Sequence, residues 1–452
     1  MTNKKPSIGI LGAGISGLAI AYKLSSKNCP VTVYEKESEV GGAIKTHHEN
    51  GWLVEKGPNT LMAKSKEIWE LLEDLDLMDK SIEAGKTAKK RFIIKNGQPI
   101  PLPMSLGSFL KTDLLSISGK FRLLKEPFAA TSNTDDESIA QFISRRLGQE
   151  PLDYAINPFV SGIYAGDPKT LSIKHTFGSL WEMEQQHGSL FKGMLKKSRN
   201  GEKPKRALIS FEQGLQQLPL AIADRLGTAV QTGTEIQTVQ QHDGQWIVKA
   251  QKDGESIHEK HDLIVSTLPV HALGNIFDNL QFNSISDLPY APLSVVALGF
   301  SSDQITHPLD GFGMLIPEVE QYQTLGTLFS SSLFPGRTPD GHVLLTSFIG
   351  GARNPELASK GPNTLQSIVL KDVQKLLDIS GNPVFTHHQH WPATIPQYTV
   401  GYDKYLSAID QIEKQHPGLF IHGNFRGGVS IPDCITSGFS IARSIVKEVE
   451  QT

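Results

Sequence analysis

The chain has 452 residues, of which 38% are hydrophobic and 20% charged, and its formal net charge at pH 7 is −3. This length exceeds what one hydrophobic core usually supports, so two or three domains are expected. The slightly negative charge argues against nucleic acid as a partner. The two cysteines, Cys29 and Cys434, cannot build a disulfide framework, which favours a reducing, cytoplasmic location.

A glycine-rich motif follows the first predicted strand. The sequence predicts a buried strand and turn in PSIGILGAG, a helix in SGLAIAYKLSSK and a second strand in PVTVYEK. Gly12, Gly14 and Gly17 have the spacing that brings a pyrophosphate to the N-terminus of a helix. Glu35, at the end of the second strand, is placed to hydrogen-bond a ribose hydroxyl. The β-α-β unit therefore predicts a Rossmann-like, dinucleotide-binding domain.

The rest of the chain alternates between helical and strand-rich stretches. An amphipathic helix is predicted over residues 65–80, and mostly helical structure over 104–200. A hairpin is predicted within 233–251, because HDG separates two strand-like runs, and more strands follow in 290–350. The THHQH run at 386–390 lies on a predicted strand whose alternate side chains point to opposite faces, so no metal site is expected.

Segments far apart in the sequence indicate which dinucleotide is bound. They are EKESEVGGAIKT, which begins with Glu35, EKGPNT at 55–60 and GLFIHGNFRGGVSIPDCITSG near the C-terminus. Together they resemble the FAD-dependent amine-oxidase superfamily. The resemblance implies FAD as the cofactor, held by a domain that is assembled from distant segments. The sequence has no second GxGxxG motif for NAD(P)H, so we expect O2 to reoxidise the flavin.

Five further sequence segments indicate one family within this superfamily. In chain order they are RFIIKNGQPIPLP, NPFVSGIYAGDPKTLSIKHTFGSLWEMEQQHGS, GFGMLIP, LGTLFSSSLFPGR and PQYTVGY. The chain from about residue 6 to 447 thus resembles the oxygen-dependent, FAD-containing protoporphyrinogen oxidase family. This resemblance implies an α/β protein with a Rossmann-like FAD domain made of separate segments, a substrate domain with an antiparallel sheet, and a helical, membrane-facing domain.

The domain boundaries can be placed along the chain from this resemblance. The FAD domain is expected in three parts, 1–85, 206–275 and 405–452. The entry to the substrate pocket and the helical, membrane-facing domain are expected in 86–205, and the substrate domain in 276–404.

The resemblance implies oxidation of protoporphyrinogen IX to protoporphyrin IX in haem biosynthesis. Six electrons would leave in three flavin cycles, and O2 would give H2O2. No catalytic side chain is singled out, because the flavin carries the redox chemistry and the protein supplies position and electrostatics. A coproporphyrinogen III oxidase of the same family stays open, since that porphyrinogen differs by two extra carboxylates. A carrier like the GDP-dissociation inhibitors shares the fold, but the intact flavin segments argue against it.

Individual residues can also be assigned from the resemblance. Arg91 matches an arginine that meets a substrate propionate, which a guanidinium can bind through two parallel hydrogen bonds. Leu315, Leu328 and Phe348 match apolar residues that sandwich the macrocycle, and Gly162 matches a point of close backbone approach. A surface role for Arg91 and plain core packing for the apolar three stay open. The positions matched to flavin contacts are Gly12, Ala13, Gly14, Ile15, Ser16, Gly17, Glu35, Lys36, Gly42, Ala43, Gly57, Pro58, Asn59, Thr60, Ile236, Trp391, Asn424, Val429, Ser430 and Ile431.

Residues 103–128 alternate apolar clusters with lysines and one arginine. An amphipathic stretch of this kind can lie on an anionic membrane surface, so peripheral contact with the inner face of the membrane is expected from the family. A helical lid over the substrate pocket is the alternative. No run of about 18 uncharged apolar residues is present, so no transmembrane helix is expected. A homodimer is compatible with the family.

Overall fold

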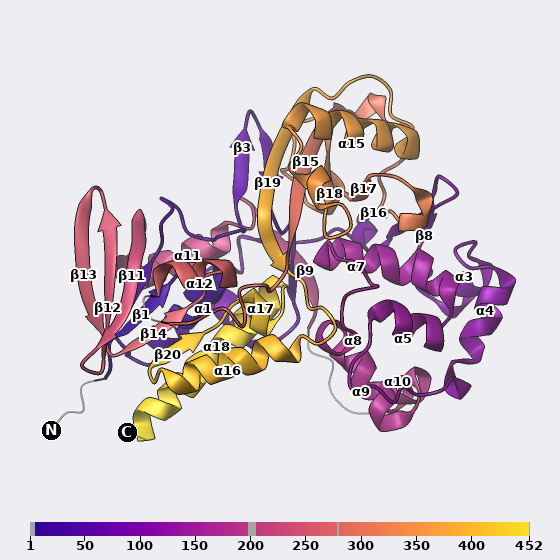
Figure 1. Cartoon of the computed structure of the whole chain (residues 1–452). Coiled ribbons are helices and arrows are strands. Elements are labelled where there is room, and N and C mark those ends of the chain that lie inside the picture. Colours follow the sequence, from indigo (N-terminus) through magenta and orange to yellow (C-terminus); the bar gives the residue numbers. More distant parts are fainter. Residues whose placement is uncertain (1–4, 198–204, 278–279, 452) are drawn as a thin grey trace.

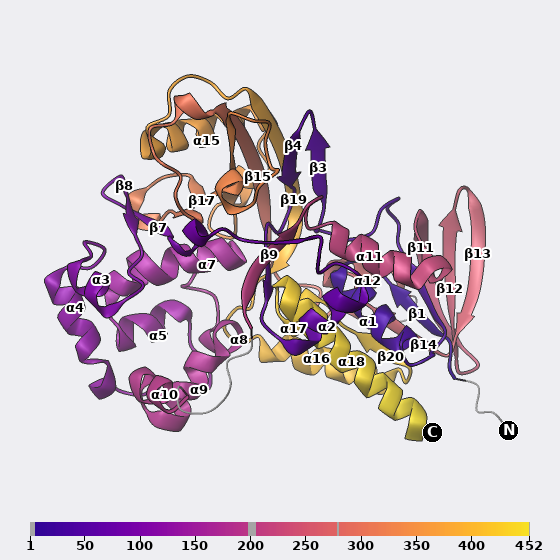
Figure 2. The ribbon, with the colours of Figure 1, turned by 180° about the vertical axis from the view of Figure 1, so that it is seen from behind.

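The computed structural model describes residues 5–197, 205–277 and 280–451. Figures 1 and 2 show a region built on a parallel sheet, a region built on the long strands β15 and β19, and a group of helices from α3 to α10 at the periphery. The protein is therefore a mixed α/β protein with a separate helical region.

The parallel sheet is assembled from segments that are far apart in the sequence. Its strand order is β10-β2-β1-β14-β20, and every neighbouring pair is parallel. Helix α1 packs against α18 near the C-terminus, where Gly438 lies close to Ala19 and Ile20. The elements are β1 (Ile8–Leu11), α1 (Ile15–Ser25), β2 (Val31–Tyr34), β10 (Val230–Gln231), β14 (Leu263–Ser266), β20 (Leu419–Ile421) and α18 (Ile431–Gln451).

A seven-stranded sheet forms the second region, in the order β19-β15-β18-β17-β16-β7-β8. Its neighbours are antiparallel, except that β16 and β7 run parallel. Helix α15 (Pro362–Leu377) contributes to the core on one face of the sheet. The strands are β7 (Phe92–Lys95), β8 (Gln98–Pro101), β15 (Tyr290–Ser301), β16 (Gly313–Leu315), β17 (Thr324–Phe329), β18 (His342–Gly350) and β19 (Phe385–Pro396).

Smaller sheets and helices complete these two regions. The predicted hairpin is confirmed as β11 and β12, with positive φ at Asp243 and Gly244 as its tight turn requires. The helix predicted over 65–80 is shorter, because a left-handed Asp76 ends it. The elements are β3 (Thr46–Glu49), β4 (Trp52–Glu55), β5 (Leu61–Ala63), α2 (Lys66–Asp74), β6 (Ser81–Glu83), β9 (Ala207–Phe211), α11 (Gln217–Leu226), β11 (Thr234–His242), β12 (Gln245–Lys252), β13 (Glu255–His261), α12 (Val270–Ile276), α13 (Ser330–Leu333), α16 (Asp403–Gln415) and α17 (Asn424–Gly427).

The helical region confirms the mostly helical structure predicted after residue 104. Leu147 is the C-cap residue of helix α5, and Gly148, with φ of 103°, turns the chain directly after it. The helices are α3 (Leu106–Lys111), α4 (Ile117–Leu124), α5 (Ile139–Arg146), α7 (Asn157–Tyr164), α8 (Ile173–Thr176), α9 (Gly178–His187) and α10 (Leu190–Lys197). None of the helices in the described ranges combines the length and the apolar character that a membrane span needs.

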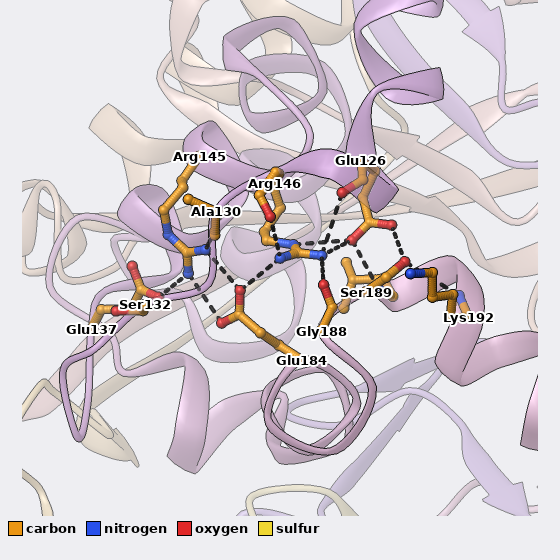
Figure 3. Close-up of polar contacts among 12 residues, drawn as sticks. Glu126, Ala130, Ser132, Glu137, Arg145, Arg146, Glu184, Gly188, Ser189 and Lys192 are labelled. Carbon is orange, nitrogen blue, oxygen red and sulfur yellow. Dashed lines mark hydrogen bonds and ion pairs between the residues drawn. The ribbon is translucent and has the colours of Figure 1, made fainter.

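A buried ionic network joins these helices (Figure 3). The guanidinium of Arg146 is fully buried, and it donates to Glu126 at 3.0 Å and to Glu184 at 2.9 Å. Glu126 also accepts from the hydroxyl of Ser189 and the backbone N–H of Leu190, at the start of α10. Because removal of one partner leaves a buried charge uncompensated, we expect such a loss to cost about 3–5 kcal/mol. The network therefore fixes the end of the 103–128 stretch to the rest of the helical region.

Candidate active site

The turn between β1 and α1 has the form of an anion-binding loop. Gly14 is the N-cap residue of α1 and has no side chain that could cap the helix. The first N–H groups of the helix are therefore available to a ligand. A Cβ on Gly17 would lie 2.1 Å from the carbonyl oxygen of Gly12, so only glycine fits there. A Cβ on Gly14 would meet nothing within 4 Å. The loop therefore has both the donors and the open space that a pyrophosphate requires.

Glu35 follows β2 at the carboxyl edge of the parallel sheet, beside this loop. Its carboxylate accepts from the backbone N–H of Ala13 at 2.9 Å and of Glu37 at 3.0 Å. Its carbonyl accepts from the N–H of Thr234 at 2.8 Å, which brings the strand that carries Ile236 to the same edge. Lys36 points outward, with its ammonium 3.8 Å from the Glu37 carboxylate. The structure thus gathers Ala13, Glu35 and Ile236, and leaves the Lys36 side chain exposed.

Two more of the predicted flavin segments meet at this loop. The N–H of Gly41 donates to the carbonyl of Ala13 at 2.9 Å, and a Cβ on Gly42 would lie 3.3 Å from the Cα of Gly14. Gly57 is pressed against Ala43, since its Cβ would lie 2.2 Å from that carbonyl oxygen. Ile15 and Ser16 are buried in the first turn of α1, while Pro58, Asn59 and Thr60 are half-buried after β4.

The last predicted flavin segments arrive from the second sheet and from the C-terminus. The indole Nε1 of Trp391 donates to the carbonyl of Lys56 at 2.6 Å. The amide of Asn424 donates to the carbonyl of Thr394 at 3.1 Å. Ser430 caps the start of α18, because its hydroxyl accepts from the N–H of Asp433. Val429 and Ser430 are half-buried between α17 and α18, and Ile431 is buried. The residues present therefore fit a long dinucleotide that reaches from α1 toward Trp391 and α18.

The apolar residues predicted to hold a substrate lie on one face of the seven-stranded sheet. Leu315 is opposite Gly326, and Gly326 is opposite Phe348. Leu328 is two residues beyond Gly326 on the same strand, so its side chain points the same way. All three apolar side chains are half-buried, whereas residues that point to the α15 face are fully enclosed: Met314, Phe329 and Ile349. We call the half-buried set, Leu315, Leu328 and Phe348, the apolar face.

Trp391 connects this apolar face to the flavin segments. On β15, Val295 is opposite Phe348 and Leu293 is opposite Trp391. Because Leu293 and Val295 are two residues apart, Phe348 and Trp391 point to the same side of the sheet. Trp391 therefore lies on the same side of the sheet as the apolar face and contacts the turn that follows β4.

Helix α7 approaches the apolar face at Gly162. A Cβ on Gly162 would lie 2.8 Å from Cδ2 of Leu315, so a larger residue would force one of the two to move. Arg353 holds this helix, because it donates to the hydroxyl of Ser161 at 2.8 Å and pairs with Glu318 at 3.2 Å. Gly162 thus lies directly against Leu315, and its part in binding a substrate stays a prediction.

Arg91 is exposed at the edge of the same face. It directly precedes β7, two residues before Ile93, which pairs with Leu315, so its side chain leaves the strand on the side of the apolar face. Its guanidinium carbon lies 5.0 Å from the centre of the Phe312 ring. Within the described ranges, no carboxylate lies in ion-pair distance of this guanidinium, whereas neighbouring Lys90 pairs with Asp310 at 2.8 Å. Arg91 is thus a cation available to an external anion.

Two ionisable residues under the flavin segments escaped the sequence analysis. Glu55 and Arg337 are 4% and 3% exposed, with 3.9 Å between their nearest charged atoms. Burial raises the pKa of Glu55 to about 7, although hydrogen bonds from Leu215 and Thr46 lower it. The available signal was that Glu55 ends the otherwise apolar run WLVE and is also the first residue of EKGPNT, the segment that predicts a turn beside the flavin. Its partner Arg337 is 282 positions away and gives no such signal.

Comparisons with known proteins agree with this geometry. The sequence model of the family described as flavin containing amine oxidoreductase matches residues 15–446. Protoporphyrinogen oxidase 2 of Arabidopsis thaliana is 35% identical, with 98% of this chain and 94% of that protein covered. Coproporphyrinogen III oxidase of Bacillus subtilis (strain 168) is 29% identical, with 97% of each chain covered.

Solved structures share the fold over nearly the whole chain. A protein from Exiguobacterium sp. 255-15 that is assigned as a protoporphyrinogen oxidase aligns with a TM-score of 0.83 and 25% identity, over 99% of this chain and 100% of that one. Reduced UDP-galactopyranose mutase aligns with a TM-score of 0.76 at 15% identity, over 98% and 96%, and so shows the fold alone. The family match confirms FAD as the predicted cofactor. The chain belongs to the flavin containing amine oxidoreductase family, and within it resembles the protoporphyrinogen and coproporphyrinogen III oxidases.

Proposed function

We propose that this protein oxidises protoporphyrinogen IX to protoporphyrin IX with FAD as its cofactor and O2 as the final electron acceptor. The observation that carries the proposal is the apolar face with Arg91 at its edge, a cation that has no carboxylate partner among the described residues. Both lie on the sheet whose Trp391 reaches the flavin segments. A porphyrinogen has the matching chemistry, since it is a wide apolar macrocycle with carboxylates at one side. The protoporphyrinogen oxidase of Arabidopsis thaliana, at 35% identity, is also more similar to this chain than the Bacillus subtilis relative, at 29%.

The chain's own residues act by binding and orientation. Bound FAD supplies the acceptor for the hydride and electrons of the substrate. Arg91 binds a propionate and fixes which edge of the macrocycle enters, because its planar fork matches a carboxylate. Leu315, Leu328 and Phe348 exclude water from the macrocycle, while Gly162 leaves room for α7 to lie against Leu315. Proton acceptance is left to solvent or to a backbone carbonyl.

The first experiment compares two substrates. Protoporphyrinogen IX and coproporphyrinogen III are oxidised in parallel by the purified protein, and porphyrin fluorescence is followed. We expect kcat/KM for protoporphyrinogen to be at least about tenfold higher, because two additional charged propionates on the other substrate would be desolvated beside apolar residues. Equal rates, or a preference for coproporphyrinogen, would instead support the activity named for the Bacillus subtilis relative.

A second part of the proposal concerns the membrane. The described large apolar side chains that are most exposed gather in the helical region, with Phe128 at 87%, Leu106 at 76% and Ile117 at 75% exposure. Phe121 and Leu124 of α4 are also exposed. Lysines and an arginine interleave with these residues, and α3 and α4 lie at the periphery in both views (Figures 1 and 2). We infer that this surface rests on the cytoplasmic face of an anionic membrane.

Vesicle binding tests this surface. The protein should sediment with vesicles of phosphatidylserine and phosphatidylcholine at low salt, and be released at high salt. A triple variant, Ile117→Ser, Phe121→Ser and Phe128→Ser, should bind at least about tenfold more weakly, because three large side chains no longer leave water. Val384→Ser, which changes an exposed residue outside the helical region, should bind like the wild type. Wild-type protein that stays in the supernatant at low salt would contradict the membrane role.

A further inference from the structure

Glu55 is a buried carboxylate at the end of β4, between two of the flavin segments. It accepts from the backbone N–H of Leu215 at 2.8 Å and from the hydroxyl of Thr46 at 2.8 Å. Thr46 in turn is bound to Gln216, whose side chain accepts from the Thr46 N–H at 2.9 Å. Glu55 therefore ties the β3–β4 hairpin to the start of α11.

Thr46 and Glu55 lie at the ends of two of the flavin segments in the sequence. Thr46 stands three residues after Ala43, and Glu55 stands two residues before Gly57. Between them, the N–H of Lys56 donates to the carbonyl of Lys45 at 2.8 Å. The carboxylate of Glu55 thus sits where the segment around Ala43 and the segment that starts at Gly57 leave the flavin site together.

Arg337 approaches the same point from the other sheet. It lies between α13 and β18, and donates to the hydroxyl of Ser210 at 2.6 Å and to the carbonyl of Phe211 at 3.3 Å. Its carbonyl also accepts from the N–H of Leu53 on β4 at 3.1 Å. Arg337 therefore joins β4 and β9 to the seven-stranded sheet, which we call the substrate-side sheet, while its guanidinium faces Glu55 at 3.9 Å.

A small cavity is lined by both Glu55 and Arg337. Its volume is about 10 Å³, and Asn59 of the flavin turn and Ser330 of α13 line it together with Glu55 and Arg337. This is the lower limit of the space that one water molecule needs, and four polar side chains supply the partners that a buried water requires. The Asn59 amide donates to the carbonyl of Gly57 at 2.9 Å, so the cavity wall is continuous with the turn Gly57–Thr60, which we call the flavin turn.

We propose that Glu55 and Arg337, bridged by one buried water molecule, are positioning residues that fix the turn Gly57–Thr60 against the flavin and against the substrate-side sheet. The inference rests on the proposed flavin site but not on the identity of the substrate. The pair connects β4 and β9 to the seven-stranded sheet beside the turn Gly57–Thr60, so its loss changes how the flavin is held.

The experiment replaces Glu55 by its neutral isostere. Glu55→Gln keeps the side-chain volume, and removes the charge that faces Arg337. The matched control is Glu49→Gln on the same hairpin, whose half-exposed carboxylate pairs with His47. The readouts are the Kd of FAD for the apoprotein, the visible spectrum of the bound flavin and its midpoint potential, none of which involves porphyrinogen turnover.

We expect Glu55→Gln to weaken FAD binding at least tenfold and to shift the flavin spectrum or potential, while Glu49→Gln matches the wild type. Arg337→Gln should have the same effect, and the double variant should be no worse than the poorer single one, because the pair acts as a unit. If Glu55→Gln does not fold, Arg337→Gln decides the question alone. Folded variants with wild-type Kd, spectrum and potential, even at a lower Tm, would show that the pair is only structural and overturn the proposal.

Discussion

Gly14→Ala should produce a folded protein that has lost its affinity for FAD. A Cβ at this position meets nothing within 4 Å, and the backbone there has φ of −69° and ψ of 172°, which alanine adopts freely. The methyl group would occupy the space through which a pyrophosphate reaches the N–H groups of α1. Two lost hydrogen bonds to a charged phosphate, at roughly 1.5–3 kcal/mol each, correspond to a weakening of about 100-fold or more. The measurement is titration of the apoprotein with FAD, with thermal unfolding of the apoprotein alongside.

Gly17→Ala is the matched comparison for this prediction. Its Cβ would lie 2.1 Å from the carbonyl oxygen of Gly12, so the turn itself must move. We expect this variant to lose stability in the apoprotein as well as FAD affinity, whereas Gly14→Ala loses only the latter. Gly14→Ala that is purified as yellow as the wild type would contradict the assignment of the phosphate site.

Arg91→Ala should raise the KM for the porphyrinogen by about 10- to 100-fold, with the Kd of FAD unchanged. The expected loss is that of one hydrogen-bonded ion pair to a carboxylate, roughly 1.5–3 kcal/mol. The guanidinium rests on the Phe312 ring, and within the described ranges it has no carboxylate of its own, so its removal should leave the fold intact. Steady-state kinetics that follow porphyrin fluorescence give KM and kcat separately.

The adjacent Lys90 supplies the control. Its ammonium pairs with Asp310 at the surface, where both side chains are about 40% exposed. Because this charge is already paired within the protein, Lys90→Ala should change KM by less than about threefold, and the loss of an exposed pair should cost only about 0–1 kcal/mol of stability. An Arg91→Ala variant with the kinetics of the wild type would return Arg91 to the surface charges and remove the support that it gives to a carboxylate-bearing substrate.

Several features of this protein follow from short stretches of sequence. The loop of Gly12, Gly14 and Gly17 and the turn at Asp243 and Gly244 depend on backbone geometry that glycine permits, and the structure has both. The end of α2 shows the limit of such reasoning. The apolar pattern predicts a helix to residue 80, but the left-handed Asp76 ends it, and the chain then leads into the short strand β6.

Pairing between strands that are distant in the sequence decided the arrangement of the predicted substrate residues. That Leu315, Leu328 and Phe348 share one face depends on the register between β16, β17 and β18, and a shift of one residue would reverse it. The parallel pairing of β7 with β16 likewise places Arg91 at the apolar face across more than 200 residues of sequence.

Buried charged residues also depend on partners that are distant in the sequence. The sequence by itself determined the cofactor loop, the cofactor and the family, because these depend on local turns and on phrases that can be compared one by one. Only the tertiary structure decided that Glu55 faces Arg337 under the flavin turn, and that Arg146 is enclosed by Glu126 and Glu184. The physical reason is that a charged residue looks the same in the sequence whether water or a distant partner compensates its charge.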